Sequence, residues 1–399
     1  MAEVRISTRA APLHNSLQKS QAMSLGIKVE LPRPRHSYEI RVGSGLLAQT
    51  GATVRAAVPT ARRVALISNA KVWRLYGAAA QESLENAGLR VHHWLMGDGE
   101  RHKNWRTLER ALDFLLDLKL ERGDAVAALG GGVTGDLAGC AAAINLRGVP
   151  FIQIPTTLLA QIDSSVGGKT GINSRHGKNL IGVFHQPATV VIDTATLGTL
   201  PRRELTAGWC EAVKQGAAGD AALFTQTYDF LAQHGPTATD APQLAQLIAA
   251  QCAFKARIVA GDEREDATRT DARSRRILNF GHTIGHALEA VTNYRRLRHG
   301  EAVGYGMLAA GELAKRLALF NETELQSLRQ AVKLCGKLPR ITDISAAAVI
   351  SALAADKKSV GGHVKWILPE QIGQSRIVDG RAISPQLLRE TLASALALS

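Results

Sequence analysis

The chain has 399 residues, of which 45% are hydrophobic and 21% are charged, an ordinary composition for a globular protein with room for two domains. No apolar run approaches the roughly 20 residues that a membrane-spanning helix needs, so we expect no membrane partner. The formal net charge of +13 comes without a zinc finger, an aromatic RNA-binding motif or a basic helix. We therefore expect an anionic small-molecule substrate and no nucleic acid.

The N-terminal residues 1–35 are rich in Arg, Ser and Lys, poor in acidic residues, and lack the apolar core of a secretory signal. Glu3 and weak amphipathicity argue against a transit-like presequence, so we expect a disordered extension, with Met23 as an alternative start. The four cysteines are scattered and form no CxxC pair. This spacing is typical of unpaired thiols in a reducing compartment, and we expect a cytoplasmic protein.

Between residues 36 and 199, short β-type runs alternate with helical stretches. The runs cover residues 38–42, 63–67, 90–95, 124–129, 151–154 and 189–192, and helical patterns such as 78–87 and 105–118 separate them. This alternation predicts a mostly parallel sheet with helices on both faces. We therefore predict a nucleotide-binding α/β domain over residues 36–199.

Residues 200–399 carry mainly helical patterns. Ala- and Leu-rich stretches predict helices over residues 203–218, 242–260, 282–291 and 301–318, and only residues 364–368 and 375–378 read as late strands. We predict a mainly α-helical second domain, with the site in the cleft between the two domains.

A Gly-rich turn follows the predicted strand at 124–129. Gly130, Gly131 and Gly132 stand between this strand and a helical pattern that contains Asp136. Glycine lets the backbone approach a ligand, and the N–H groups of a helix start can bind phosphate. A plain tight turn is the alternative, but the strand-to-helix context favours pyrophosphate binding, although the motif is not GxGxxG.

Three segments within 25 residues join small residues to hydroxyl groups or lysines. They are PTTL with Thr156 and Thr157, DSSVGGK from Asp163 to Lys169, and GKN with Lys178 and Asn179. Any one lysine is typical of a solvated surface. Three such loops in succession instead indicate binding of phosphate, carboxylate or ribose groups.

The segment 279–286 (NFGHTIGH) places His282 and His286 four residues apart. On a helix this spacing puts both imidazoles on one face, which is typical of divalent-metal sites. His299 heads the next helical pattern. Gly281 and Gly285 would each cost about 1 kcal/mol in a helix interior, which indicates that something approaches this backbone closely.

A carboxylate would complete such a metal site, and Glu211 in GWCEAVK is the best candidate. It lies on an otherwise apolar helix, where a buried glutamate needs a cation. That cation is either a metal ion or Lys214. Two surface histidines and a salt-bridged glutamate therefore remain the alternative to a metal centre.

Ordered motifs from about residue 100 to residue 373 resemble the 3-dehydroquinate synthase family. They include GDGE with Lys103, GGGVTGDLAG, Arg147-Gly148, IPTTLLAQIDSSVGGKTGIN, GKNLIG, GWCEAVK, DERE, LNFGHTIGHALEA, HGEAV and Asp356-Lys357-Lys358. The resemblance implies a Rossmann-like NAD domain, a helical metal- and substrate-binding domain, and a homodimer. It also implies Zn²⁺ as the metal, with Co²⁺ as an alternative.

The resemblance further implies a role for each matching residue. Glu211, His282 and His299 would bind the metal, and His286 would be a catalytic group and not a ligand. The residues that would hold NAD are Gly131, Gly132, Asp136, Thr156, Thr157 and Lys178, with Glu100 and Lys103 near its adenosine end. The substrate would contact Asp163, Arg147, Lys169, Asn179, Lys214, Lys255, Arg275, Asn279 and either Lys357 or Lys358.

The family's substrate is a seven-carbon keto-sugar acid phosphate, 3-deoxy-D-arabino-heptulosonate 7-phosphate. The implied reaction is a transient oxidation by NAD, elimination of phosphate, re-reduction and an intramolecular aldol closure to 3-dehydroquinate, on the route to aromatic amino acids. The cationic residues would bind the carboxylate and phosphate ends.

Several positions depart from the family pattern. The segment between DERE and NFGH is longer and more basic than usual, which leaves either Arg275 or Arg276 as the substrate arginine. The alternatives to the implied activity are a related cyclase that makes a valiolone or an aminated product, and a metal-dependent polyol dehydrogenase. The Lys255, Arg275 and Asn279 set favours a substrate with a carboxylate.

Overall fold

The computed structural model describes residues 4–8, 25–29, 37–266, 268–357 and 364–397. The chain divides into two compact units, Met1–Ser37 and Tyr38–Ser399. In the first unit, strands β1 (Val4–Thr8) and β2 (Leu25–Val29) pair in antiparallel fashion. The expectation of disorder in residues 1–35 therefore does not hold for these two strands, and the rest of that extension lies outside the described residues.

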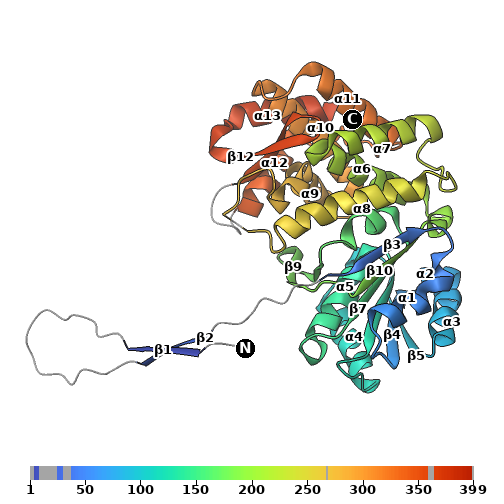
Figure 1. The fold of residues 1–399 in the computed structure, drawn as a ribbon. Coiled ribbons are helices and arrows are strands. Elements are labelled where there is room, and N and C mark those ends of the chain that lie inside the picture. Colours follow the sequence, from blue (N-terminus) through green and yellow to red (C-terminus); the bar gives the residue numbers. More distant parts are fainter. Residues whose placement is uncertain (1–3, 9–24, 30–36, 267, 358–363, 398–399) are drawn as a thin grey trace, which may run out of the picture. The chain divides into compact units, whose positions relative to one another are not determined.

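The first part of the larger unit is a six-stranded sheet in the order β3-β10-β7-β6-β4-β5 (Figure 1). Every neighbouring pair in it is parallel, as the alternation of strands and helices predicts. The six strands match the six predicted runs within a residue or two at either end. They are β3 (Glu39–Gly43), β4 (Arg63–Asn69), β5 (Arg90–Met96), β6 (Ala125–Gly130), β7 (Phe151–Pro155) and β10 (Thr189–Asp193).

Helices cover both faces of this sheet. Val64 and Leu66 of β4 pack in one core cluster with residues of α1 (Thr50–Ala57) and α3 (Ala78–Asn86). Ala65 and Ile67, which point the other way, pack with α4 (Trp105–Asp117) and α5 (Gly132–Ile144). Because side chains alternate along a strand, burial on both faces explains why these strands are continuous apolar runs.

The second part is helical, as predicted, with one two-stranded sheet. The late strands pair in antiparallel fashion as β11 (Lys365–Gln371) and β12 (Gln374–Asp379). The helices are α6 (Arg202–Gly219), α7 (Ala221–His234), α8 (Leu244–Gly261), α9 (His282–Val291), α10 (His299–Arg316), α11 (Glu322–Leu334), α12 (Ala346–Lys357) and α13 (Pro385–Ala397).

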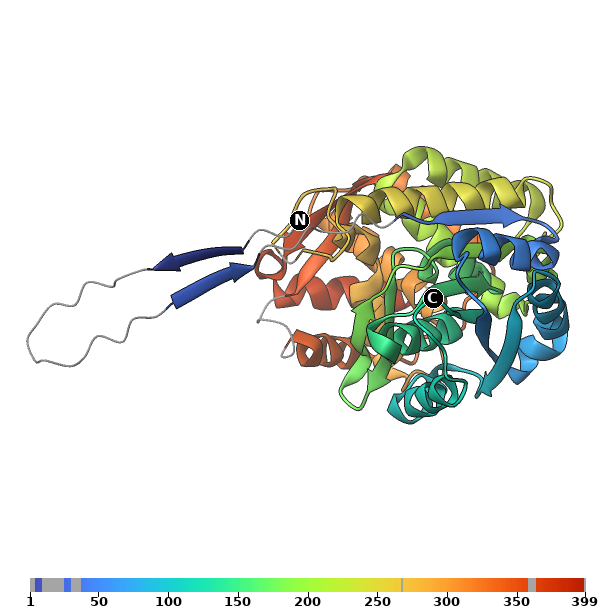
Figure 2. The ribbon, with the colours of Figure 1, turned by 60° about the horizontal axis from the view of Figure 1, so that its bottom comes forward.

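A third hydrophobic cluster joins strand β10 of the sheet to the helices. Val190 and Ile192 of β10 belong to the same cluster as Trp209 of α6 and Phe254 of α8. Helix α8 runs beside β3 at the boundary, which both ribbon views show (Figure 2). The predicted boundary near residue 200 thus separates two architectures that are packed into one compact unit, Tyr38–Ser399.

One element differs from the expectation of anion-binding loops. Lys169 begins strand β8 (Lys169–Ser174), and Lys178 and Asn179 lie on β9 (Gly177–Phe184), which pairs with β8 as an antiparallel hairpin. Glycines, lysines and polar residues gave this segment the composition of a loop. The hairpin packs on α5, so tertiary contacts and backbone pairing outweigh the weak strand propensity.

The strand order places the Gly-rich turn where a ligand is expected. The chain leaves β4 towards β5 on one side, and it leaves β6 towards β7 on the other, although β4 and β6 are neighbours. In open parallel sheets, ligands bind outside the carboxyl ends of the strands at such a reversal. Gly130 ends β6, and α5 begins at Gly132, so the turn lies at this point.

Candidate active site

Three imidazoles gather where α9 meets the start of α10. The ring nitrogens of His282, His286 and His299 include a set of atoms that all lie within 4.8 Å of one another. His282 and His286 lie on one face of α9, as their spacing predicts, and their ring centroids are 5.3 Å apart. His299, the first residue of α10, lies beside them, with its ring centroid 5.1 Å from that of His282.

The glycines beside these histidines let two helices come together. Gly281 has a φ of 76° and caps α9, and a Cβ there would lie 2.9 Å from the Val303 carbonyl oxygen of α10. A Cβ on Gly285 would lie 3.2 Å from Ala302. The close approach that the glycines indicated is therefore made by helix α10, and it is what brings His299 to the other two imidazoles.

Glu211 of α6 faces the same group. Its Oε1 lies 3.8 Å from His282 Nε2 and 3.5 Å from His299 Nε2, and its side chain is 1% exposed. Lys214 Nζ lies 2.9 Å from Glu211 Oε2 in an ion pair. Among the described residues, neither carboxylate oxygen of Glu211 has a partner with hydrogen-bond geometry. A buried carboxylate with this little compensation calls for a further cation.

The residues present fit a divalent metal ion. Ligand atoms bound at about 2.0–2.2 Å to a tetrahedral ion lie roughly 3.4 Å from one another, close to the 3.5 and 3.8 Å separations here. His282 Nδ1 donates to the Phe280 carbonyl oxygen at 3.1 Å, which leaves Nε2 with a free lone pair. Burial, then Lys214 and the other two imidazoles, lower the pKa of His282 well below its ordinary value, which favours the neutral ring that a metal ligand needs.

His299 is oriented by a second carboxylate. Its Nδ1 lies 3.1 Å from Oε2 of Glu289, and this side chain is 2% exposed. Burial lowers the pKa of His299, but Glu289 and Glu211 outweigh burial and raise it above its usual value. The other oxygen of Glu289 accepts from Lys178 Nζ at 2.8 Å. Nδ1 of each of the two imidazoles is thus occupied, and Nε2 of each faces Glu211.

The backbone at His299 is fixed by Glu301. Its carboxylate accepts from Nε and Nη2 of Arg203 at 2.7 and 2.6 Å and from the Arg298 backbone N–H at 2.7 Å. Such a carboxylate near the start of α10 satisfies donors that the helix leaves open. This contact holds the first turn of α10, and with it His299, against α6.

Buried lysines surround the carboxylate of Asp163. This residue lies on the single turn η5 (Ala160–Ser164), where a π-type backbone replaces α-helix, as often happens at functional sites. Lys255 Nζ lies 2.9 Å from Asp163 Oδ1, and Lys214 Nζ lies 3.9 Å from it. Although burial raises the pKa of Asp163, the two lysines outweigh that effect and hold it far below its usual value. Burial lowers the pKa of Lys255 despite its carboxylate partner.

A second network lies on the sheet side, around Lys103. Its ammonium group lies 2.8 Å from Asp136 Oδ2 and 3.6 Å from Glu100 Oε1, and it also donates to Asn179. Burial lowers the pKa of Lys103, but Asp136 and Glu100 outweigh it and raise that pKa. Because Asn179 follows Lys178 on β9, the hairpin connects this network to Glu289 and the metal-side cluster.

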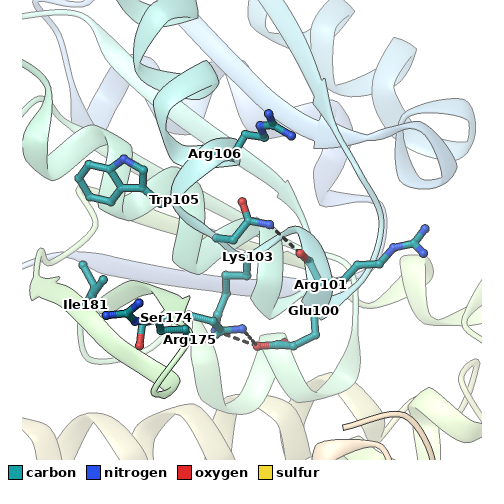
Figure 3. Close-up of a pocket in the computed structure, with 10 residues that line it drawn as sticks. Glu100, Arg101, Lys103, Trp105, Arg106, Ser174, Arg175 and Ile181 are labelled. Atoms are coloured by element: carbon teal, nitrogen blue, oxygen red, sulfur yellow. Dashed lines mark hydrogen bonds and ion pairs between the residues drawn. The ribbon is translucent and has the colours of Figure 1, made fainter. Parts of the chain in front are cut away.

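An open pocket lies beside this network. Figure 3 shows Glu100, Lys103, Trp105, Arg106 and Arg175 among the residues that line it. Asn173 donates to Glu100 at 2.7 Å, and Glu100 is within ion-pair distance of Lys103. The predicted cofactor residues Glu100 and Lys103 thus lie together at a surface depression, with their charges already paired.

The Gly-rich turn leaves no room for side chains. A Cβ on Gly131 would lie 3.0 Å from Thr157 Cγ2, and one on Gly132 would lie 2.9 Å from Ser164 Oγ. The backbone N–H of Thr156 donates to the Gly130 carbonyl oxygen at 3.0 Å, so the loops after β6 and β7 are joined. The predicted residues Gly131, Gly132, Thr156 and Thr157 therefore form one surface at the start of α5, where N–H groups are available to an anion.

Lys169, Arg275 and Asn279 lie around the segment that follows α8. Lys169 forms an ion pair with Glu265, and Asn279 Nδ2 lies 3.4 Å from the same carboxylate. Arg275, of which 2% is exposed, donates to the carbonyl oxygens of Glu263 and Gly167 at 2.7 and 3.0 Å. Of the two candidate arginines, Arg275 is the one that reaches the loop between Asp163 and Lys169.

One predicted residue lies apart from these clusters, and another cannot be placed because its side chain is outside the described residues. Arg147 is exposed at the end of the turn η4 (Asn145–Arg147), with a φ of 67°. Lys357 ends α12, and its side chain lies outside the described residues, as does all of Lys358. The sequence reasoning in turn assigned no role to Glu265 or Glu289. Both lie in quoted motifs, DERE and GHALEA, but only the fold shows which lysines they face.

Comparisons with known proteins point to one family. The N-terminal and C-terminal family models of 3-dehydroquinate synthase match residues 93–207 and 208–359. The 3-dehydroquinate synthase of Ruegeria pomeroyi is 45% identical over 368 residues, which cover 90% of this chain and 96% of the relative. That of Thermosynechococcus vestitus is 44% identical over 368 residues, covering 91% and 98%.

Solved structures show the same architecture. The 2-epi-5-epi-valiolone synthase ValA from Streptomyces hygroscopicus, with NAD⁺ and Zn²⁺ bound, has a TM-score of 0.82 and 28% identity, over 93% of this chain and 99% of that chain. A 2-deoxy-scyllo-inosose synthase has a TM-score of 0.77 and 24% identity, over 89% and 96%, and so shares the fold. The relatives above are closer in sequence than either structure. This chain belongs to the 3-dehydroquinate synthase family of phosphate-eliminating cyclases.

Proposed function

We propose that this chain converts 3-deoxy-D-arabino-heptulosonate 7-phosphate to 3-dehydroquinate and phosphate at the cluster that Glu211, His282 and His299 form. The observation that carries the proposal is the buried Glu211 carboxylate, which faces two Nε2 atoms at 3.5 and 3.8 Å and lacks hydrogen-bond partners among the described residues. This donor set suits Zn²⁺ or Co²⁺.

NAD would be held on the sheet side of the site. Gly131, Gly132, Thr156 and Thr157 would receive its pyrophosphate on backbone and hydroxyl groups, with Asp136, Lys178, Glu100 and Lys103 around it. When bound, the metal polarises a substrate hydroxyl as a Lewis acid, and NAD accepts and returns a hydride.

The cationic side chains would bind the two anionic ends of the substrate. Lys214 and Lys255 converge on Asp163, and Lys169 and Asn279 converge on Glu265. Each group therefore presents cationic or N–H donors that could bind a carboxylate or phosphate oxygen. Arg275, Asn179 and either Lys357 or Lys358 would complete the contacts. Fixing the substrate at both ends sets the geometry of elimination and ring closure.

His286 is the proposed proton-transfer group. It is exposed, whereas Glu211 is fully buried, and it stands at the edge of the imidazole group. An exposed imidazole can exchange its proton with water between steps, as a general acid or base must. We therefore assign the third ligand position to Glu211 and not to His286.

The main alternative is a cyclase that forms a valiolone, because such an enzyme shares this fold. Product analysis distinguishes the two. The protein would be incubated with NAD and Zn²⁺, and with either the heptulosonate phosphate or a heptulose 7-phosphate that lacks the carboxylate. We expect the NMR spectrum of 3-dehydroquinate from the first substrate and no cyclised product from the second. The reverse result would contradict the proposal.

We also infer a cytoplasmic homodimer. Every cysteine is free and buried, which suits a reducing compartment. In the described part of the chain no helix has the length and hydropathy to cross a membrane. Leu180, Ile181, Val183 and Phe184 expose apolar surface along β9, which a second copy could cover. Size-exclusion chromatography with light scattering would test the dimer.

A further inference from the structure

We propose that Glu289 is a positioning residue that orients the metal ligand His299 and ties it to the cofactor-side strand β9 through Lys178. This inference rests on the proposed function, because it takes His299 to be a metal ligand and Lys178 to be a cofactor contact. It adds a role that neither the sequence motifs nor the geometry of the three ligands assigns.

Glu289 is buried on α9 and uses both of its oxygens. Oε2 lies 3.1 Å from His299 Nδ1, and Oε1 accepts from Lys178 Nζ at 2.8 Å. The side chain is 2% exposed, so bulk water cannot replace either partner. A carboxylate held between two donors on β9 and α10 has little freedom to rotate, and each donor is fixed in turn.

The contact with Glu289 determines which nitrogen of His299 faces the metal position. With its proton on Nδ1, the ring directs the Nε2 lone pair towards the space beside Glu211 Oε1, 3.5 Å away. A ligand imidazole commonly depends on such an outer carboxylate for its tautomer, its orientation and its basicity.

The two histidine ligands differ in what orients them. His282 Nδ1 donates to the backbone carbonyl oxygen of Phe280. This acceptor is uncharged, and because it belongs to the backbone, substitution of a side chain does not remove it. His299 Nδ1 instead faces a charged side chain. Substitution of Glu289 therefore perturbs one ligand and leaves the other in place.

Lys178 gives this carboxylate a second connection. Its ammonium group also lies over the Tyr294 ring, 4.5 Å from the centroid, so it is held between α9 and the turn that follows. Asn179, the next residue on β9, accepts from Lys103 in the sheet-side network. Glu289 thus joins the metal ligand His299 to Lys178 on β9, and the neighbouring residue Asn179 contacts the sheet-side network.

Glu289→Gln is the substitution that tests the proposal. Glutamine keeps the shape of the side chain but carries no charge, and its amide can accept from only one of the two donors. The amide NH₂ group would then face a second donor. We expect zinc affinity to fall by about 10–100-fold, the usual effect of removing such an outer carboxylate.

Glu312→Gln is the matched control. Glu312 is also a buried glutamate paired with cations, at 3.2 Å from Arg316 Nε and 3.1 Å from Arg329 Nη2. It lies thirteen positions after His299 on α10, about 20 Å along the helix axis. We expect the control to bind zinc as the wild type does, whatever it does to thermal stability.

Zinc affinity would be measured by competition with a chromophoric chelator on the full chain, beside the visible spectrum of the Co²⁺-loaded protein. Loss of affinity with an altered Co²⁺ spectrum in Glu289→Gln, and neither change in Glu312→Gln, would support the proposal. Glu289→Asp, which keeps the charge but is one methylene shorter, serves if the glutamine variant does not fold. We expect the zinc affinity of Glu289→Asp to lie between that of the wild type and that of Glu289→Gln.

Zinc affinity within twofold of wild type in every Glu289 variant that folds would overturn the positioning role. A wild-type protein that binds zinc but forms no 3-dehydroquinate would contradict the proposed function, and the comparison of zinc affinities would still stand. A wild-type protein that binds no zinc would contradict both.

Discussion

The turn after β6 and the cluster between α6, α9 and α10 present different groups to a ligand. The turn offers backbone N–H groups and has no room for side chains of its own, because a Cβ on Gly131 or Gly132 would meet neighbouring side chains at 3.0 or 2.9 Å. The cluster offers buried ionisable side chains, such as Glu211 and Lys214, each 1% exposed. Ligand binding at the turn thus depends on the absence of side chains. Ligand binding at the cluster depends on buried charges, which are compensated by their ion-pair partners and by a metal ion.

Because of this difference, we expect substitutions at the turn and substitutions at the cluster to affect different ligands. A change at the turn should act through shape, and it should weaken cofactor binding while metal binding is kept. A change at the cluster should act through charge and coordination, and it should affect the metal first.

The largest effect is expected at His282. His282→Ala removes one of the proposed ligands and should abolish zinc retention, with kcat/KM lower by about 10³-fold or more because the preorganised charge at the reacting centre is lost. Metal content by mass spectrometry and a phosphate-release assay measure the two effects. His92→Ala, at an exposed position on the edge strand β5, is the control. Retention of stoichiometric zinc by His282→Ala would contradict the assignment of His282 as a metal ligand, and with it the metal-binding role of the cluster.

His286→Ala should separate metal binding from proton transfer. Because His286 is the exposed member of the imidazole group, we expect zinc content to remain near that of wild type. The value of kcat should fall by about 10²–10³-fold, the usual size of a general acid–base contribution. A zinc-free His286→Ala protein would show that this residue, and not Glu211, is the third ligand.

A smaller effect is expected at the turn. Gly131→Val places a branched side chain against Thr157, where Cγ2 would lie 3.0 Å from the new Cβ. Overpacking of this kind costs about 1–3 kcal/mol, which corresponds to a roughly 5–150-fold loss of NAD affinity if the cofactor occupies the same space. Isothermal titration with NAD measures it, and zinc content should not change. Gly261→Val is the control, because a Cβ at Gly261 has no neighbour within 4 Å. Equal NAD affinity in both variants would argue against a cofactor site at the turn.

The smallest effect is expected at Asp124, a carboxylate that the backbone compensates fully. Burial raises the pKa of Asp124, but backbone N–H groups of Glu121, Arg62 and Arg63 outweigh burial and hold it below its ordinary value of 3.8. Its contribution to stability is therefore present above pH 3.8 and is lost as the pH falls through the lower folded-state pKa.

Asp124→Asn should lower the free energy of unfolding by about 1–2 kcal/mol near neutral pH, since it weakens charge-assisted hydrogen bonds. Denaturant titrations at a series of pH values measure this difference. We expect it to stay constant from neutral pH to pH 5 and to shrink below about pH 4. A difference that grows as the pH falls would contradict the folded-state pKa.

The sequence predicted the sheet better than it predicted the contacts around the site. Val64 to Ile67 are apolar on both faces, and that pattern identified a buried parallel strand without knowledge of its neighbours. The HxxxH spacing likewise identified a shared helix face, because both positions belong to one local period. Such features depend on residues close together in the chain.

Contacts between distant segments could not be predicted from local patterns. The Lys178–Glu289 and Lys169–Glu265 pairs join residues far apart in the sequence, and no periodicity connects them. The hairpin of β8 and β9 was not predicted, because glycines such as Gly171 and Gly182 are typical of loops. In the hairpin these glycines let the two backbones approach closely. A Cβ on Gly182 would lie only 2.2 Å from the Thr170 carbonyl oxygen. The roles of Arg147 and Lys357 stay predictions.

The most direct test of the account is phosphate release from the heptulosonate phosphate by the full chain, with NAD, before and after treatment with a chelator. If Glu211, His282 and His299 hold an essential divalent ion, chelation abolishes release, and added Zn²⁺ or Co²⁺ restores it without accumulation of NADH. Undiminished phosphate release from a chelated protein shown to be metal-free would contradict the account.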